Sequence, residues 1–165
     1  MDADMVNDDF RKFIRPDRYQ VFLMACPVAI PFHFASHTWI VANKKGKVSR
    51  WEVLFRKNKC KTSWNHLHQD FLPPFRGIET IPYWPKYFQK SRIVGIVEGN
   101  EGSTAHKMTE FVENSKYNYP YRDRYFYLGP NCNTFTQWAF DHFPDAGLTL
   151  PANAIGKGFP FKQIK

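Results

Sequence analysis

The first third of the chain alternates apolar stretches with polar turns, and this pattern predicts three neighbouring strands. Residues 20–26 form a nearly continuous apolar run that ends at Pro27, which is typical of a buried strand. Residues 36–42 and 48–55 are rich in β-branched and aromatic side chains and flank turn-forming residues at 43–47. We therefore predict that these two segments pair as a β-hairpin.

The second half of the chain predicts one more strand and two helices. Residues 92–98 have the composition of a central strand. Ser103 can cap a helix that continues to about residue 115. Asn131 is a second good N-cap, and the helix after it should end before Pro144. The apolar positions of this last helix have the i, i+3, i+4, i+8 spacing of one buried face: Phe135, Trp138, Ala139 and Phe143.

The remaining segments complete the predicted architecture. Residues 1–18 are polar with mixed charge and indicate an N-terminal arm with a short helix. Residues 56–91 are basic, then aromatic and proline-rich, which is typical of a long surface excursion with one or two short strands. A tyrosine-rich stretch predicts a short strand at 125–128. We expect a single α+β domain over 19–165, in which a small antiparallel sheet packs against two or three helices.

The amino-acid composition leaves the predicted fold unchanged and bears on the size of the core and the cellular location. The 165 residues are 43% hydrophobic and 18% aromatic, which is enough for a substantial core. Three cysteines do not resemble a disulfide framework and indicate a reducing compartment. The acidic start lacks the positive charge of a signal peptide, and the longest apolar run, 21–32, is too short to span a bilayer. We therefore expect a soluble cytoplasmic protein.

Cys132 occupies the first position of the helix that Asn131 caps, where thiol chemistry is favoured. The unpaired N–H groups and the macrodipole of a helix N-terminus stabilise a thiolate, and they can also bind a developing oxyanion. The side-chain amides of Asn131 and Asn133 flank the sulfur and are further candidate oxyanion donors. Cys132 is therefore the candidate nucleophile.

A general base has to come from elsewhere in the chain. His37 begins a predicted strand, which is a rigid support for an imidazole. Glu52, on the facing strand of the hairpin, is the candidate third residue that orients His37. One turn length sets Val53 opposite His37 and another sets Glu52 there, so the sequence leaves the register open. His33 is a second candidate base, but it lies in a less rigid segment after Pro31.

Three segments carry a resemblance: Ser-His-Thr-Trp at 36–39, Gly-Pro-Asn-Cys-Asn-Thr-Phe at 129–135 and Leu-Pro-Ala-Asn-Ala-Ile-Gly-Lys at 150–157. Their order, with His early on a strand and Cys late at a helix N-terminus, resembles the circularly permuted papain-like (NlpC-type) superfamily. More narrowly, they resemble an uncharacterised bacterial family of unknown function with the motif Gly-Pro-Asn-(Cys/Ser)-Asn-Thr-Phe.

The resemblance implies a permuted papain-like fold and a thiol-dependent amide or ester hydrolase, or an acyltransferase. Cys132 would attack a peptide, amide or acyl substrate, His37 would transfer the proton, and Glu52 would orient His37. Asn131 or Asn133 would help to bind the oxyanion. No cofactor is implied. The identity of the substrate and the oligomeric state are left open.

A non-catalytic binding module is the alternative function. The formal net charge of +8 and the pI near 9.4 permit an anionic partner. Positive charge interleaved with aromatic side chains is how single-stranded nucleic acid is held. On the predicted hairpin this pattern falls on Lys44, Lys45, Lys47, Arg50 and Trp51.

A metal site is a weaker interpretation of the segment that follows the hairpin. His66, His68 and Asp70 would share one face of a strand, with Cys60 nearby. The segment lacks the paired-cysteine or His-x₃-His spacing of zinc sites. We therefore expect a polar surface segment and no metal.

Overall fold

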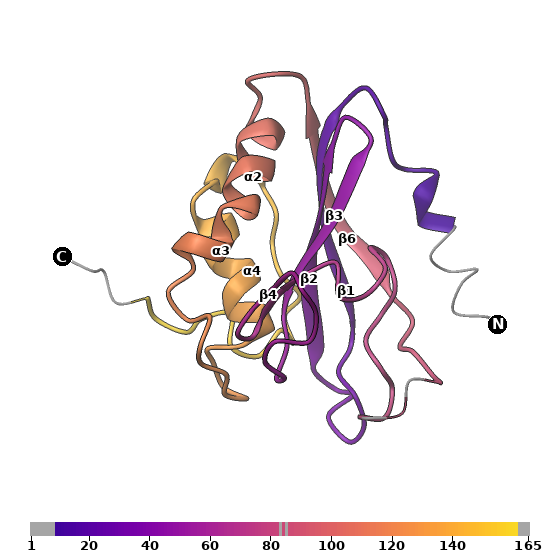
Figure 1. Ribbon diagram of the computed structural model, residues 1–165, viewed down its shortest axis with the longest axis vertical. Coiled ribbons are helices and arrows are strands. Elements are labelled where there is room, and N and C mark those ends of the chain that lie inside the picture. Colours follow the sequence, from indigo (N-terminus) through magenta and orange to yellow (C-terminus); the bar gives the residue numbers. More distant parts are fainter. Residues whose placement is uncertain (1–8, 83, 85, 162–165) are drawn as a thin grey trace.

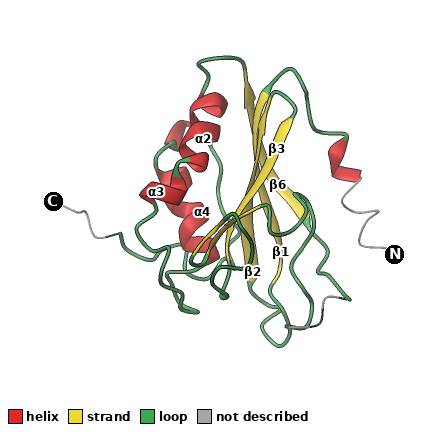
Figure 2. Ribbon diagram, viewed as in Figure 1, coloured by secondary structure: helices red, strands yellow, loops and turns green. Residues whose placement is uncertain are grey.

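One antiparallel sheet forms the centre of the molecule, with the helices of residues 104–141 on one side and a short helical turn at 9–11 on the other (Figures 1 and 2). The computed structural model describes residues 9–82, 84 and 86–161. The strands are β1 (Tyr19–Pro27), β2 (Ser36–Lys44), β3 (Lys47–Val53), β4 (Ser63–Trp64), β5 (Leu67–Gln69) and β6 (Arg92–Gly99). The helices are α2 (Thr104–Glu113), α3 (Ser115–Asn118), α4 (Cys132–Asp141) and the 3₁₀ turn η1 (Pro144–Ala146). The architecture is α+β, as the sequence predicts.

The three strands of the first third form the middle of the sheet, whose order is β4-β5-β3-β2-β1-β6. The hairpin between β2 and β3 turns through two residues, Lys45 and Gly46, both with positive φ (51° and 93°). This turn matches the right-handed twist of the flanking strands, and Gly46 adopts the left-handed region without a steric cost. The predicted hairpin is confirmed, with a shorter loop than the sequence indicated.

The prediction that residues 92–98 form a central strand is wrong, because β6 lies at the edge of the sheet and pairs only with β1 among the described strands. Its apolar character has another cause. Val94 and Val97 pack against the core on the helical side, whereas Ile93 packs against the core on the opposite side. β6 has the apolar sequence of a central strand because it contributes partly buried side chains to both cores, although Ile96 remains 40% exposed.

The sheet separates two cores. On the helical side, α2 and α4 bury Met108, Val112 and Phe135 against Val21 and Ile40 of the sheet. On the other side, a smaller cluster around Phe22, Trp39 and Phe75 lies beneath the loop that precedes β6 and beneath the N-terminal segment. Within the described part of the chain, no helix has the length and apolarity that a membrane crossing requires.

The two predicted helix starts are confirmed by their capping bonds. The Ser103 hydroxyl accepts a hydrogen bond from the backbone N–H of His106, 3.2 Å away, and α2 begins at the next residue. Asn131 caps α4 in a capping box, because its side chain accepts from the backbone of Thr134 and the Thr134 hydroxyl accepts from the backbone N–H of Asn131. These local bonds explain why both helices begin where the sequence predicts.

The short strand predicted at 125–128 is wrong. This segment is a turn in which the N–H of Gly129 donates to the carbonyl of Phe126. Phe126, Tyr127 and Leu128 are exposed, so their aromatic and apolar character does not come from burial in a sheet. The turn carries the chain directly into α4.

Candidate active site

The candidate catalytic residues come together at the end of the sheet where α4 begins. His37 is the second residue of β2, Glu52 is the next-to-last residue of β3, and Cys132 is the first residue of α4. All three are buried. The three sequence segments that carry the resemblance, at 36–39, 129–135 and 150–157, also meet here through the hydrogen bonds described below.

The strand register brings Glu52 to His37 diagonally. Ala42 pairs with Ser49, so the same register places Glu52 opposite Trp39, two residues from His37 and on the same face of the sheet. Neither of the two registers considered from the sequence is the observed one. A diagonal neighbour in a sheet is within reach of a long side chain, and Glu52 Oε2 lies 3.1 Å from His37 Nε2.

Arg50 holds Glu52 in place from the other side. Its Nη2 donates to Glu52 Oε2 at 2.7 Å, and its Nη1 donates to the backbone carbonyls of Pro73 and Arg76. The guanidinium also lies over the Trp39 ring, 4.3 Å from its centroid. Burial raises the pKa of Glu52, but the positive charge of Arg50 and the hydrogen bond from His37 outweigh it and lower the pKa to about 2. Glu52 is therefore a carboxylate at neutral pH.

The His37 imidazole interacts with the Cys132 sulfur as well as with Glu52. Burial lowers the pKa of His37, but the negative charge of a Cys132 thiolate, a hydrogen bond to that side chain and the contact with Glu52 outweigh burial and raise the pKa to about 9. Because Nε2 faces Glu52, Nδ1 is the ring nitrogen left for the sulfur. The raised pKa favours the imidazolium form of His37 at neutral pH.

The side-chain amides of Asn131 and Asn133 are used to build the start of α4. Asn131 Nδ2 donates to the carbonyls of Tyr127 (2.9 Å) and Ile155 (3.0 Å). Asn133 Nδ2 donates to the carbonyls of Ser36 and Ile155, both at 2.8 Å. A carboxamide has two N–H bonds, and in both residues each of them is already donated to a backbone carbonyl. Neither side chain therefore has an N–H left for an oxyanion. The backbone N–H of Cys132, in the first turn of the helix, is then the donor best suited to an oxyanion.

The segment at 150–157 locks the start of α4 against the start of β2. The Asn153 side chain accepts from the Ser36 hydroxyl at 2.8 Å and its carbonyl accepts from the Ser36 N–H at 3.1 Å. The Thr134 hydroxyl donates to the carbonyl of Gly156 at 2.7 Å. On the strand, Thr38 Oγ1 donates to Asn133 Oδ1 at 2.9 Å. Contacts on both sides of His37 thus fix the distance between β2 and the residue that follows Cys132.

Gly156 supports this arrangement by leaving room for Asn131. Its φ is +94°, and a Cβ at this position would lie 2.4 Å from Asn131 Nδ2. We expect Gly156→Ala to displace the Asn131 cap and to lower the free energy of unfolding by about 2 kcal/mol, measured by urea denaturation. The control is Gly102→Ala, where φ is +77° but nothing lies within 4 Å of the added Cβ. Equal losses in the two variants would contradict the steric role of Gly156.

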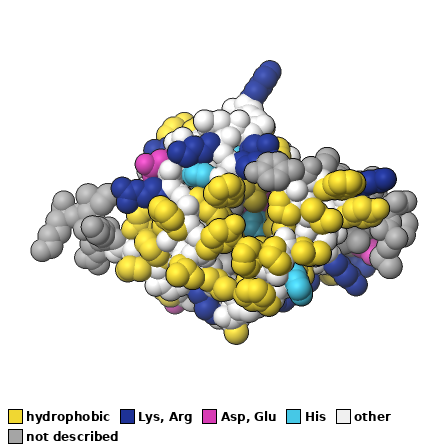
Figure 3. Space-filling view, turned by 90° about the horizontal axis from the view of Figure 1, so that it is seen from below, with side chains coloured by type: hydrophobic (Ala, Val, Ile, Leu, Met, Phe, Trp, Pro, Cys, Tyr) yellow, Lys and Arg dark blue, Asp and Glu magenta, His cyan; other side chains and the backbone are white. Residues whose placement is uncertain are grey.

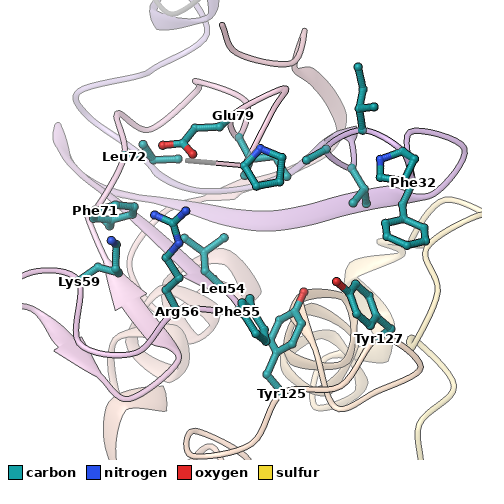
Figure 4. Close-up of a pocket in the computed structure, with 16 residues that line it drawn as sticks. Phe32, Leu54, Phe55, Arg56, Lys59, Phe71, Leu72, Glu79, Tyr125 and Tyr127 are labelled. Atoms are coloured by element: carbon teal, nitrogen blue, oxygen red, sulfur yellow. The ribbon is translucent and has the colours of Figure 1, made fainter. Parts of the chain in front are cut away.

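A pocket of about 430 Å³ is lined by segments that adjoin the candidate site in the sequence: Leu54 lies two positions after Glu52, and Tyr125 and Tyr127 precede α4 (Figure 4). Its wall combines the loop after β1, the loop after β3 and the segment that leads into α4, including Phe32, Leu54, Phe55, Tyr125 and Tyr127. The hydroxyl ends of the two tyrosines point into the pocket near one end of a helix (Figure 4). The lining is predominantly apolar, as is common in sites for small organic groups.

Tyr125 lines the pocket and also responds to the charge of Cys132. Burial and the negative charge of a Cys132 thiolate both raise the pKa of Tyr125, so its hydroxyl belongs to the electrostatic surroundings of the thiol. Neither Cys132 nor His37 forms part of the pocket wall. Both residues are almost completely buried, since Cys132 is 4% exposed to solvent and His37 is 3% exposed. Approach to the sulfur is therefore narrow.

The residues of the nucleic-acid alternative do not form one surface. Arg50 and Trp51 are 0% and 1% exposed, so neither can contact a nucleic acid in this fold. Lys44 pairs with Glu113 at 2.8 Å and Lys45 pairs with Glu101 at 3.1 Å, whereas Lys47 is exposed. The alternation of basic and aromatic residues on this hairpin reflects two buried faces rather than a binding surface.

The histidines after the hairpin also have structural partners. His68 Nδ1 lies 2.7 Å from the Ser63 hydroxyl, and His68 Nε2 lies 2.9 Å from the carbonyl of Arg56. His66 Nδ1 contacts the carbonyl of Leu54 at 2.8 Å. Among the residues with described positions, no group of three or more His, Cys, Asp or Glu side chains could hold a metal ion. His33, the second candidate base, is exposed in the loop after β1.

Arg50 and Asn153 are the residues of the site that sequence reasoning missed. Arg50 was grouped with the exposed lysines of the hairpin, although its position two residues before Glu52 puts both side chains on one face of the strand. That spacing was the available signal. Asn153 stands in the 150–157 segment, and no local pattern indicates that it pairs with Ser36, 117 positions earlier.

The fold and this cluster define an α+β domain with a buried Cys–His–Glu arrangement at the start of a helix. The chain belongs to the DUF3750 family, described as a protein of unknown function, whose family model matches residues 19–159. This result agrees with the expected family of unknown function. No curated protein and no solved structure matches the chain.

Proposed function

We propose that this protein is a thiol-dependent hydrolase or acyltransferase that acts on amide or ester bonds. The observation that carries the proposal is the buried, hydrogen-bonded series Arg50–Glu52–His37 with Cys132 next to it at the start of α4. Thr38 and Asn133, the residues that follow His37 and Cys132, are joined by a 2.9 Å hydrogen bond. In this series a carboxylate orients one ring nitrogen of His37, and the other ring nitrogen is left for the sulfur. A nucleophile, a base and a group that orients the base are the parts that covalent acyl transfer requires.

The first half of the reaction forms a thioester. The Cys132 thiolate attacks the carbonyl carbon of the substrate, and the electron pair moves to the carbonyl oxygen, which the backbone N–H of Cys132 stabilises. The tetrahedral intermediate collapses as the imidazolium of His37 gives its proton to the leaving amine or alcohol. Glu52 keeps the ring oriented and compensates its positive charge throughout.

The second half releases the acyl group. His37, now neutral, takes a proton from water or from an acceptor alcohol or amine as its oxygen or nitrogen attacks the thioester carbon. Cys132 leaves as the thiolate, and the imidazolium is restored. Water gives hydrolysis and another acceptor gives acyl transfer, so the same residues serve both reactions. The steps use Cys132, His37 and Glu52 together with the backbone N–H of Cys132.

A permuted papain-like fold is part of the same proposal. Its support is the order of the elements, with the histidine on β2 in the first third of the chain and the cysteine at the start of α4 in the last third. The free thiols of Cys26, Cys60 and Cys132 suit a reducing environment, and a cytoplasmic location is proposed on that ground.

The test uses p-nitrophenyl esters, from acetate to longer acyl chains. We expect a burst of about one equivalent of p-nitrophenolate, because acylation of a thiolate by an activated ester is faster than deacylation. Intact-protein and peptide mass spectrometry should place the acyl group on Cys132. The burst should disappear in Cys132→Ala.

The matched controls are Cys60→Ser and His33→Ala, since both residues lie outside the buried series and should leave the burst unchanged. His37→Ala should retain the fold but slow the burst strongly. An acyl group on Cys60 instead of Cys132, or a burst that survives Cys132→Ala, would contradict the proposed function.

A further inference from the structure

The loops that line the pocket carry several exposed apolar side chains, both in the pocket wall and directly beside it in the sequence. Leu128 is 79% exposed to solvent and Phe126 is 63% exposed. We define the apolar rim as these two residues together with their exposed neighbours Phe32, Phe34, Phe55 and Tyr127. Figure 3, which views the molecule from below, shows hydrophobic side chains gathered over this end around a hollow. Isolated exposed apolar residues are ordinary, but a contiguous patch marks an interaction surface.

The rim is contiguous although it comes from three separate loops. The rings of Phe32 and Tyr127 lie 5.3 Å apart, and those of Phe32 and Phe34 lie 6.2 Å apart. Phe55 packs against Tyr125 in the pocket wall, with the two ring centroids 5.6 Å apart. Phe126 and Leu128 flank Tyr127 in the turn at 126–129, and all three side chains are exposed. The three loops thus present one apolar end of the molecule.

Positive charge flanks the rim. The two segments 54–61 and 121–128 contain six Lys or Arg residues and one Asp. Lys57, Lys59 and Arg124 are exposed beside Phe55 and Phe126. Lys and Arg side chains lie around the apolar side chains in Figure 3. Apolar tips surrounded by cations are complementary to an anionic bilayer, in which phosphate groups lie just outside the acyl chains.

We propose that the apolar rim docks this protein on an anionic membrane surface. The rim enters the boundary between headgroups and acyl chains, while Lys57, Lys59 and Arg124 contact lipid phosphate. This orientation turns the mouth of the pocket towards the bilayer, so that an acyl chain can enter it directly from the membrane. The docking rests on the surface alone and does not require that Cys132 be catalytic.

Vesicle co-sedimentation of the full chain tests the proposal. Vesicles of phosphatidylcholine with phosphatidylglycerol should bind the protein, and Phe126→Ser combined with Leu128→Ser should weaken this binding roughly tenfold or more. Both residues are exposed, so the double variant should keep its thermal unfolding midpoint. Lys57→Gln combined with Arg124→Gln should weaken binding to the anionic vesicles and leave the small residual binding to pure phosphatidylcholine unchanged.

The control is Tyr117→Ser combined with Ile96→Ser, because these exposed apolar residues lie on α3 and β6 and not on the rim. This variant should bind vesicles like the wild type. Failure of the wild type to bind anionic vesicles, or equal binding by the rim variant, would overturn the proposal. So would a concentration-dependent dimer, seen by sedimentation velocity, that the rim variant abolishes, since the rim would then cover a second copy of the chain.

Discussion

The alkylation rate of Cys132 by iodoacetamide is expected to change little between pH 6 and pH 8.5 in the wild type and to rise steeply with pH in His37→Ala. An ordinary thiol with a pKa near 8.5 is about 0.3% ionised at pH 6, so its rate increases by about two orders of magnitude over this range. A thiolate held by an imidazolium is already ionised, and its rate should rise less than about tenfold. Comparison of rates within each variant removes the effect of restricted access to the sulfur.

The upper end of the same pH profile reports on His37. Cys132 and Glu52 raise the pKa of His37 to about 9, so the imidazolium persists through neutral pH and is lost as the pH rises through 9. The wild-type rate should therefore show an inflection near pH 9 that His37→Ala lacks. The same sign applies to stability, since the contribution of His37 is complete below its ordinary pKa of 6.5 and disappears between pH 6.5 and about 9.

The other two cysteines need separate treatment in this experiment. Burial raises the pKa of Cys26 to about 12, so Cys26 should remain unlabelled in the folded protein. Burial opposes ionisation of Cys60, but hydrogen bonds from Ser63 and Thr62 outweigh it and lower its pKa. The alkylation rate of Cys132 should therefore be measured in a Cys60→Ser variant, and peptide mass spectrometry should identify which cysteine carries the label. A wild-type profile as steep as that of His37→Ala would show that the imidazole does not activate the sulfur.

Replacing Glu52 by Gln is expected to lower the free energy of unfolding by about 3–5 kcal/mol. Glu52 is fully buried between the guanidinium of Arg50 and the imidazole of His37. The variant leaves Arg50 without its buried counter-charge and removes one of the two groups that raise the pKa of His37. Removal of one partner from a buried ion pair is costly because the remaining charge stays in a medium of low polarity. Urea denaturation at pH 7 gives the loss directly.

The pH dependence distinguishes a lost charge from altered packing. The pKa of Glu52 is lowered from 4.5 to about 2, so its stabilisation is present above pH 4.5 and is lost as the pH falls towards 2. The difference in stability between wild type and Glu52→Gln should therefore shrink over this window. The matched control is Glu113→Gln, which breaks the partly exposed pair with Lys44 and should cost less than about 1 kcal/mol. Similar losses in the two variants would show that the buried network contributes no more than a surface pair.

Much of the fold follows from local signals in the sequence. The apolar run of β1, the turn residues of the hairpin and the caps Ser103 and Asn131 act through neighbours within a few positions, and the structure confirms the elements they predict. Two predictions were wrong: residues 92–98 form an edge strand and not a central one, and residues 125–128 form a turn and not a strand. In both places apolar residues serve contacts with distant segments or form an exposed surface, and local composition does not distinguish these cases from a buried strand.

The candidate site divides in the same way. Cys132 and His37 could be named as candidates from the sequence because an N-cap and a strand are local features. The diagonal contact of Glu52 depends on a register set by the two-residue turn at Lys45 and Gly46. One residue more in that turn would have moved Glu52 to the other face of the sheet relative to His37.

The sequence by itself determined where the main strands and helices begin and which residue would head the last helix, because capping bonds and side-chain periodicity act over a few residues. Only the tertiary structure decided that Arg50 is buried on Glu52, that Asn153 and Gly156 hold the start of α4 against β2, and that the exposed aromatic residues of three loops form one rim. These contacts join positions up to more than a hundred residues apart, and they form only when the sheet and helices pack together.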